Sequence, residues 1–188
     1  WRHHWHTCRV CHSEGGLIAL ELAAGINRVK PAALVLAATP GRRLGTVLND
    51  QLEKIMIRQG ADEAIRRDML ASNSAIVAHI LETGEIPDNV PDGLKPLYPR
   101  YLRHFLRSTF ALDPLALARA TEGPVLVLNG GSDPQVLADR DASALAMALM
   151  GRGMPSAVQI IGNVSHTLKQ TPSMQANAHE GDIHPDVI

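Results

Sequence analysis

Short apolar runs alternate along the chain with longer segments whose apolar residues recur at helical spacing. The three clearest runs cover residues 32–38 (AALVLAA), 124–129 (PVLVLN) and 157–161 (AVQII). Each is followed by a segment rich in Gly, Pro, Ser or Asn. Runs of this length and composition are typical of buried strands. Their alternation with helices predicts a parallel sheet with helices packed against it.

The segments between these runs predict helices and one loop. The helices expected from the apolar spacing cover residues 15–27, 44–83 with a break near Gly60, 98–110 and 141–150. Asp113 followed by Pro114 predicts an N-cap and a first helical residue, with a short helix ending at Ala120. The four prolines between residues 86 and 99 predict an extended loop. Beyond Gln170 the chain is polar and irregular.

A serine lies among small residues directly before the first predicted helix. Residues 12–16 read His-Ser-Glu-Gly-Gly. A serine on a sharp turn from strand to helix is held out into a site, and the helix N-terminus then points at the reacting centre. A serine in this place is also a common helix N-cap, which is the alternative interpretation of Ser13.

Three residues that together suit nucleophilic catalysis each follow a predicted strand. They are Ser13, Asp133 and His166, in that chain order. Because chemistry gathers at the carboxyl ends of parallel strands, we expect their side chains to meet. His166 would take the proton of the Ser13 hydroxyl and return it to the leaving group. Asp133 would fix the tautomer of His166, and the backbone N–H of Glu14 would help to hold the oxyanion.

Simpler interpretations of the acid and the base remain open at this point. Asp133 after Gly-Gly-Ser also suits a turn, and His166 also suits an exposed loop. Asp139 and Asp141 compete with Asp133 for the role of the acid, although we expect both to begin the helix that follows them.

Several segments, in this order, together resemble one family. They are HSEGGLIAL (12–20), ALVLAATPGR (33–42), LDPLAL (112–117), PVLVLNGGSDPQV (124–136) and NVSHTLK (163–169). They resemble the bacterial α/β-hydrolases of the esterase and serine-aminopeptidase-like type, which carry a helical cap. The resemblance extends from about Val10 to about Lys169. It implies that Ser13 is the nucleophile, Asp133 the acid and His166 the base.

The resemblance also implies an architecture. We expect a partial α/β-hydrolase core of about four mostly parallel strands with flanking helices, plus a helical cap. Residues 1–42 and 111–188 would form the core, and residues 43–110 the cap inserted into it. The family has four or five strands before the nucleophile, so we expect this chain to begin within the family's sheet, without its first strands.

The surroundings of the serine depart from the family in two ways. The family has Gly two residues before the nucleophile, where this chain has Cys11. We expect Cys11, His12, Gly15 and Gly16 to shape the elbow. The second oxyanion donor comes from a loop before the nucleophile, and we expect this loop to be missing. Losing one such donor costs about 10²–10³ in rate.

These observations predict a serine hydrolase that cleaves carboxylic esters of short or medium acyl chains through an acyl-enzyme on Ser13. No cofactor is required. A peptidase, an acyltransferase, or a weak or inactive hydrolase fragment that serves as an interaction module are the alternatives. Because the first strand would lack its outer neighbour, we also expect a homodimer or another homo-oligomer that covers the open edge.

Composition and charge add mainly exclusions. The chain has 188 residues and a net charge of -1 at pH 7, so nothing favours binding to nucleic acid or to an anionic membrane. No apolar run approaches the roughly 20 residues of a membrane helix. With no signal peptide visible, the sequence favours a soluble, cytoplasmic protein.

The N-terminal segment carries two patterns of other chemistry. Residues 8–12 read C-x-x-C-H, as in c-type haem attachment, but a haem there would displace the predicted strand and helix. Zinc would suit the residue types of His3, His4, His6, Cys8 and Cys11, but their spacing matches no standard site. We therefore expect neither a haem nor a functional metal.

Overall fold

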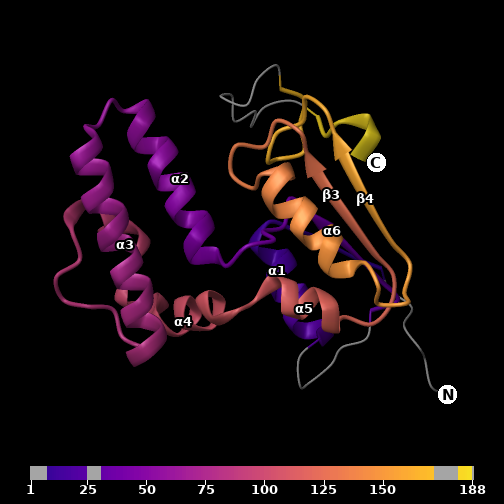
Figure 1. The fold of residues 1–188 in the computed structure, drawn as a ribbon, viewed down its shortest axis with the longest axis horizontal. Coiled ribbons are helices and arrows are strands. Elements are labelled where there is room, and N and C mark those ends of the chain that lie inside the picture. Colours follow the sequence, from indigo (N-terminus) through magenta and orange to yellow (C-terminus); the bar gives the residue numbers. More distant parts are fainter. Residues whose placement is uncertain (1–7, 25–30, 172–181, 188) are drawn as a thin grey trace. The chain divides into compact units, whose positions relative to one another are not determined.

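The computed structural model describes residues 8–24, 31–171 and 182–187 (Figure 1). The chain divides into two compact units, one formed by residues 1–42 and 113–188 and the other by residues 43–112. The first unit contains a sheet with helices, and the second is helical.

The first unit is built on a four-stranded sheet. Its strands are β1 (Cys8–His12), β2 (Ala33–Ala37), β3 (Val125–Gly130) and β4 (Ser156–Ile161), and they lie in the order β1-β2-β3-β4. All neighbouring pairs are parallel. The predicted fold class, a partial α/β core with about four parallel strands and flanking helices, is confirmed.

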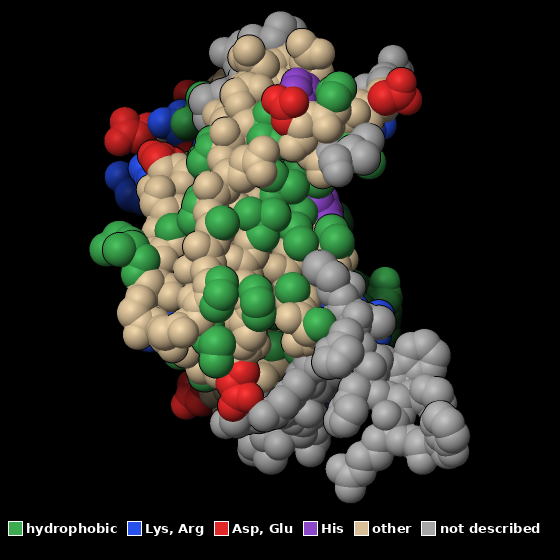
Figure 2. All heavy atoms as spheres, turned by 90° about the vertical axis from the view of Figure 1, so that its right-hand side faces the viewer, with side chains coloured by type: hydrophobic (Ala, Val, Ile, Leu, Met, Phe, Trp, Pro, Cys, Tyr) green, Lys and Arg blue, Asp and Glu red, His purple; other side chains and the backbone are tan. Residues whose placement is uncertain are grey.

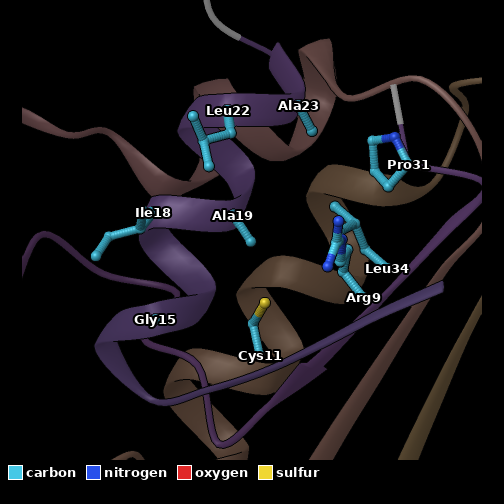
Figure 3. A pocket seen from close by; sticks show the side chains of 9 residues that line it. All are labelled: Arg9, Cys11, Gly15, Ile18, Ala19, Leu22, Ala23, Pro31 and Leu34. Atoms are coloured by element: carbon cyan, nitrogen blue, oxygen red, sulfur yellow. The ribbon is translucent and has the colours of Figure 1, made fainter. Parts of the chain in front are cut away.

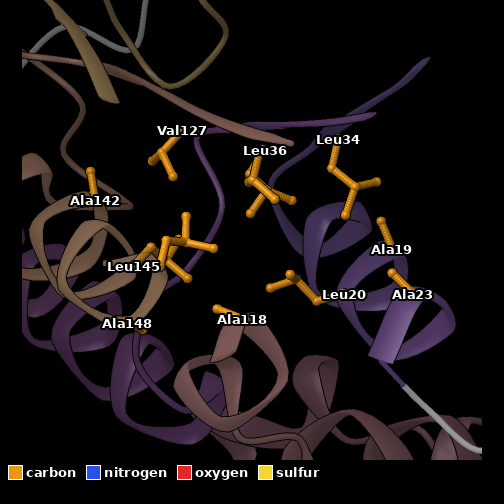
Figure 4. Packing of buried hydrophobic residues seen from close by; sticks show 12 residues of the cluster. Ala19, Leu20, Ala23, Leu34, Leu36, Ala118, Val127, Ala142, Leu145 and Ala148 are labelled. Carbon is orange, nitrogen blue, oxygen red and sulfur yellow. The ribbon is translucent and has the colours of Figure 1, made fainter. Parts of the chain in front are cut away.

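One face of this sheet is covered by helices. They are α1 (Glu14–Ala24), α5 (Pro114–Ala120) and α6 (Ser143–Leu149). Side chains of the strands, among them Leu36 and Val127, point toward Leu20 and Leu145 of the helices (Figure 4). Leu20, Leu36 and Leu145 are fully buried. Burial of one such side chain stabilises the fold by about 1.5–3 kcal/mol, so this aliphatic layer holds the sheet in place.

The predicted cap of the short helix α5 is confirmed. The Asp113 carboxylate accepts hydrogen bonds from the backbone N–H groups of Leu115 and Ala116, at 3.1 and 3.0 Å. Pro114 occupies the first turn, where its missing N–H has no intrahelical partner to lose. The cap therefore satisfies two of the amides that the start of a helix leaves free.

The opposite face of the sheet is covered at one end. There, Ala37, Leu128 and Ile161 pack with Val164, and Val187 lies against this cluster. The register places Val10, Val35, Leu126 and Ala157 in one row on the same face. Val10 is 71% exposed, although it lies in a strand. From the side on which β3 and β4 lie in Figure 1, hydrophobic side chains gather in the middle of the surface (Figure 2).

The second unit has its own apolar core. It contains α2 (Leu44–Arg58), α3 (Glu63–Thr83) and α4 (Arg103–Ala111), with 3-10 helices at Asp92–Leu97 and Arg100–Leu102. The predicted break near Gly60 is confirmed, and Gly60 has a positive φ of 72°. The prediction of a purely extended loop over 86–99 was wrong, because Pro91 leads into the 3-10 helix that includes Pro96.

A buried polar network crosses this second core. Asn73 is fully buried, and its side-chain amide donates to the Asn49 carbonyl oxygen at 2.8 Å. The Tyr98 hydroxyl donates to the Asn73 carbonyl oxygen at 2.5 Å. Burial raises the pKa of Tyr98 to about 12, which keeps the phenol protonated as a donor.

Candidate active site

The turn between β1 and α1 consists of Ser13 alone. β1 ends at His12 and α1 begins at Glu14. Ser13 has a φ of 53°, in the left-handed region that residues other than glycine rarely adopt. Its backbone N–H donates to the Ala37 carbonyl oxygen at 2.8 Å, which ties the turn to the end of β2. Such a conformation costs about 1–3 kcal/mol and persists only where the surroundings enforce it.

The glycines after Ser13 differ in what their positions tolerate. A Cβ atom on Gly16 would lie 2.0 Å from the Oγ1 of Thr39, so α1 can approach the end of β2 only with glycine there. A Cβ atom on Gly15 would have no described atom within 4 Å. Cys11 is half-buried and packs against the core under the helices. Of these positions, only Gly16 is a steric requirement of the turn.

Ser13, His166 and Asp133 form one chain of hydrogen bonds. The Ser13 Oγ lies 3.0 Å from Nε2 of His166, and Nδ1 of His166 lies 2.8 Å from Oδ2 of Asp133. His166 is 7% and Asp133 1% exposed. A carboxylate only accepts, so Nδ1 of His166 carries its proton and Nε2 is free to accept from the serine hydroxyl. The structure thus brings together three residues from three separate turns.

The turn that carries Asp133 is fixed by its own hydrogen bonds. Oδ1 of Asp133 accepts from the backbone N–H groups of Gln135 and Val136, at 2.8 and 3.0 Å. The side-chain amide of the buried Asn129 donates to the carbonyl oxygens of Gly130 and Val136, both at 3.1 Å. The loop amides therefore hold Oδ1 of the carboxylate, and this orients Oδ2 toward His166.

The Asp133 turn and the His166 turn touch through their main chains. The Gly131 N–H donates to the Ile161 carbonyl oxygen at 2.7 Å, and the Ser132 N–H donates to the Val164 carbonyl oxygen at 3.0 Å. A Cβ atom on Gly130 would lie 2.2 Å from that same Val164 oxygen. The close approach requires glycine at 130, a role that the sequence analysis did not assign. The Gly-Gly pair after a buried strand was the available signal.

Asp141, the competitor for the acid, is bound elsewhere. It is fully buried, and its carboxylate accepts from Nε and Nη2 of Arg42 at 3.0 and 2.9 Å and from the Leu137 N–H at 2.9 Å. Asp139 and Asp141 lie where the helix begins, as expected, in a π-helical turn (Ala138–Ala142) that leads directly into α6. Asp141 anchors that turn to the segment after β2.

Glu14 lies directly after Ser13 at the start of α1. Its backbone N–H is one of the first amides of the helix, which have no intrahelical acceptor, so a hydrogen-bond donor lies next to Ser13 in the chain. The Glu14 side chain is half-buried, and burial raises the pKa of its carboxyl above the usual value.

The described residues show neither a cluster of metal ligands nor a membrane-spanning helix. In the described part of the chain, no three His, Cys, Asp or Glu side chains lie close enough to hold a metal ion. His3, His4, His6 and the Cys8 side chain, which were considered as zinc ligands from the sequence, lie outside the described residues. None of the described helices is long and apolar enough to cross a membrane.

A cavity of about 420 Å³ lies beside β1 and α1, away from the serine hydroxyl. Its lining is apolar except for the side chain of Arg9 and the thiol of Cys11. Figure 3 shows both side chains extending from β1 toward α1, with Ile18 and Leu22 on the helix across from them. Neither Ser13 nor His166 lines this cavity.

The sheet order, the one-residue turn at Ser13 and the placement of Asp133 and His166 decide the fold. The chain has a partial α/β-hydrolase fold. No family model and no curated protein matches it.

Solved structures with similar folds have low sequence identity to the chain. A bromoperoxidase from Bacillus anthracis is 15% identical over 87% of this chain and 61% of its own, with a TM-score of 0.49. An esterase domain of a Rhodothermus marinus protein is 15% identical over 87% of this chain and 53% of its own, with a TM-score of 0.46. A puromycin-hydrolyzing peptidase of Mycobacterium tuberculosis is 21% identical over 85% of this chain and 18% of its own, with a TM-score of 0.47. The chain spans less than two thirds of each.

Proposed function

We propose that this chain is a serine hydrolase that cleaves carboxylic esters of short or medium acyl chains through an acyl-enzyme on Ser13. The observation that carries this proposal is the hydrogen-bond chain from the Ser13 hydroxyl through His166 to Asp133, at 3.0 and 2.8 Å. The left-handed conformation of Ser13 supports it, because strain of this kind clusters at functional sites.

The proposed reaction has two steps, acylation of Ser13 and hydrolysis of the acyl-enzyme. Ser13 Oγ attacks the ester carbonyl carbon while His166 Nε2 takes the hydroxyl proton. The tetrahedral oxyanion accepts a hydrogen bond from the Glu14 N–H, and collapse breaks the bond to the alkoxide, which leaves with the proton from His166. Water then attacks the acyl-enzyme in the same way, so that the carboxylic acid is released and Ser13 regains its proton.

Asp133 supplies orientation and charge in this scheme. With Nδ1 of His166 bonded to Asp133, the imidazole presents Nε2 to Ser13, and the imidazolium that forms is stabilised by the carboxylate. We assign one oxyanion donor, Glu14, among the described residues. Removing one such donor from an oxyanion site typically lowers the rate by about 10²–10³, so we expect the Glu14 amide to contribute strongly to turnover.

We propose an ester as the substrate because esters are easier to cleave than amides. An alkoxide leaves more readily than an amine, so ester cleavage needs less oxyanion stabilisation than amide cleavage. Peptidase and acyltransferase activities are the alternatives on the same acyl-enzyme.

A fluorophosphonate probe and p-nitrophenyl butyrate test the proposal directly. Wild type should be labelled and should hydrolyse the ester, whereas Ser13→Ala should lose both. Ser108→Ala removes another serine, exposed on α4, and should behave as wild type. Wild-type protein that is folded but shows no Ser13-dependent labelling would contradict the enzyme and favour the interaction module.

We also propose that the chain associates with a second copy through its sheet. β1 and β4 are the two edges of the described sheet, and Val10 on β1 is 71% exposed. Unpaired strand edges with apolar side chains favour association. Light scattering at micromolar concentration should show a dimer that Val10→Lys weakens, and a monomeric wild type would contradict this proposal.

A further inference from the structure

His12, the residue directly before Ser13, is in contact with the residue proposed as the base. Nε2 of His12 lies 2.7 Å from the backbone carbonyl oxygen of His166. The two imidazole rings are tilted by 55°, with their centroids 4.8 Å apart. Because a carbonyl oxygen only accepts hydrogen bonds, Nε2 of His12 carries a proton and is the donor in this bond.

The His12 bond acts on the main chain of His166, whereas the bonds to Asp133 and Ser13 act on its ring. Asp133 and Ser13 hold the imidazole ring of His166 at its two nitrogens. Within the turn, the Ser165 N–H donates to the Lys169 carbonyl oxygen at 2.8 Å, and Leu168 has a positive φ of 62°. The His166 carbonyl oxygen points to His12 instead. This bond fixes the main chain of the base against the elbow.

The bond joins residues that are 154 positions apart in sequence, and one of them is the chain neighbour of Ser13. His12 and Ser13 are adjacent, so a shift of the His166 main chain relative to His12 is also a shift of its Nε2 relative to the Ser13 Oγ. A misplacement of about 1 Å in such a pair costs about 10² in rate.

We propose that His12 is a positioning residue, which sets the distance from Ser13 Oγ to His166 Nε2 by donating its ring N–H to the His166 main chain. This inference rests on the proposed function for its kinetic consequence, but its structural part stands without turnover. His12 is exposed, so its ring adds little burial to the stability of the fold.

Two substitutions separate the hydrogen bond from the ring contact. His12→Phe keeps a ring beside His166 but removes the donor. His12→Gln removes the ring but keeps an N–H that can reach the same carbonyl. His104→Gln, on the exposed side of α4, is the matched control. All three variants should melt within a few degrees of wild type, as expected for proteins whose fold is intact.

We expect His12→Phe to slow fluorophosphonate labelling of Ser13 by about 10- to 100-fold and to lower kcat for p-nitrophenyl butyrate by a similar factor, with KM unchanged. His12→Gln should recover most of this loss. Equal rates for wild type and His12→Phe would overturn the inference. Equal losses in both variants would also overturn it, because the donor would then not be the cause.

A proton NMR signal of His166 can test the positioning role of His12 without any measurement of enzyme activity. The proton on Nδ1 of His166, bonded to Asp133, should be observed downfield in wild type and in His12→Gln, and should broaden or move in His12→Phe. An unchanged signal in His12→Phe would count against the positioning role. If wild type is not labelled at Ser13, the proposed function fails, and this signal still decides the role of His12.

Discussion

Asp133 and Asp141 are two buried aspartates, eight positions apart, that have different roles within the same unit. Each carboxylate accepts from backbone N–H groups and from one cationic or potentially cationic side chain. Asp141 faces Arg42, which stays charged, so the pair holds two segments together. Asp133 faces His166, whose other nitrogen reaches a hydroxyl, so the pair can take part in proton transfer.

The two aspartates differ in the chemistry of their partners. Arg42 does not lose its proton at ordinary pH, and its guanidinium bonds to both oxygens of the Asp141 carboxylate. His166 has a second nitrogen that remains free to accept. A buried carboxylate is therefore a structural anchor or part of a reaction centre according to its partner, and burial alone does not distinguish the two.

The largest expected effect comes from Asp133→Asn. The amide keeps the shape of the carboxylate but favours the wrong tautomer of His166, so the labelling rate of Ser13 should fall by about 10⁴. Circular dichroism and melting should change little. A labelling rate within tenfold of wild type would remove Asp133 from the proposed mechanism.

Asp141→Ala should show the reverse pattern. It leaves the Arg42 guanidinium partly buried without its carboxylate, and loss of one partner of a buried ion pair costs about 3–5 kcal/mol of unfolding free energy. Urea denaturation measures this loss. The fraction that remains folded should be labelled at the wild-type rate; a fall in that rate comparable to that of Asp133→Asn would break the comparison.

A glycine lies against each aspartate turn and offers a smaller, steric test. A Cβ atom on Gly130 would lie 2.2 Å from the backbone carbonyl oxygen of Val164. A Cβ atom on Gly41 would lie 2.1 Å from the backbone carbonyl oxygen of Asp141. Each change to alanine should cost about 1–3 kcal/mol by urea denaturation. Only Gly130→Ala should also slow labelling of the folded protein. Gly15→Ala is the control, because a Cβ atom there meets no described atom within 4 Å.

The smallest effect concerns a third carboxyl, that of Glu14, whose pKa is raised by burial alone. A raised pKa in the fold means that this group favours folding at low pH and that the contribution is lost as pH rises through the folded value. Glu14→Gln should therefore raise the melting temperature slightly at pH 7 and not at pH 4. Melting curves at the two pH values measure this difference, and a gain at pH 4 alone would contradict the assigned cause.

Much of the sheet was predictable because its signal is local. The runs that contain Leu36, Val127 and Ile161 are mainly apolar over five to seven residues and are followed by turn residues, which is sufficient to predict buried strands. Asp113 and Pro114 were likewise sufficient for the start of α5. The 3-10 helix at Asp92–Leu97 was missed, because prolines are compatible with both an extended loop and a tight helical turn.

By itself, the sequence determined which residues stand at the ends of the strands, and so it predicted that Ser13, Asp133 and His166 would meet. Only the tertiary structure decided what surrounds them. The steric limits at Gly16 and Gly130, the partner of Asp141 and the bond from His12 to His166 all join segments far apart in the chain. Local patterns record the preferences of one segment, whereas a contact between two turns exists only after the sheet has brought their ends together.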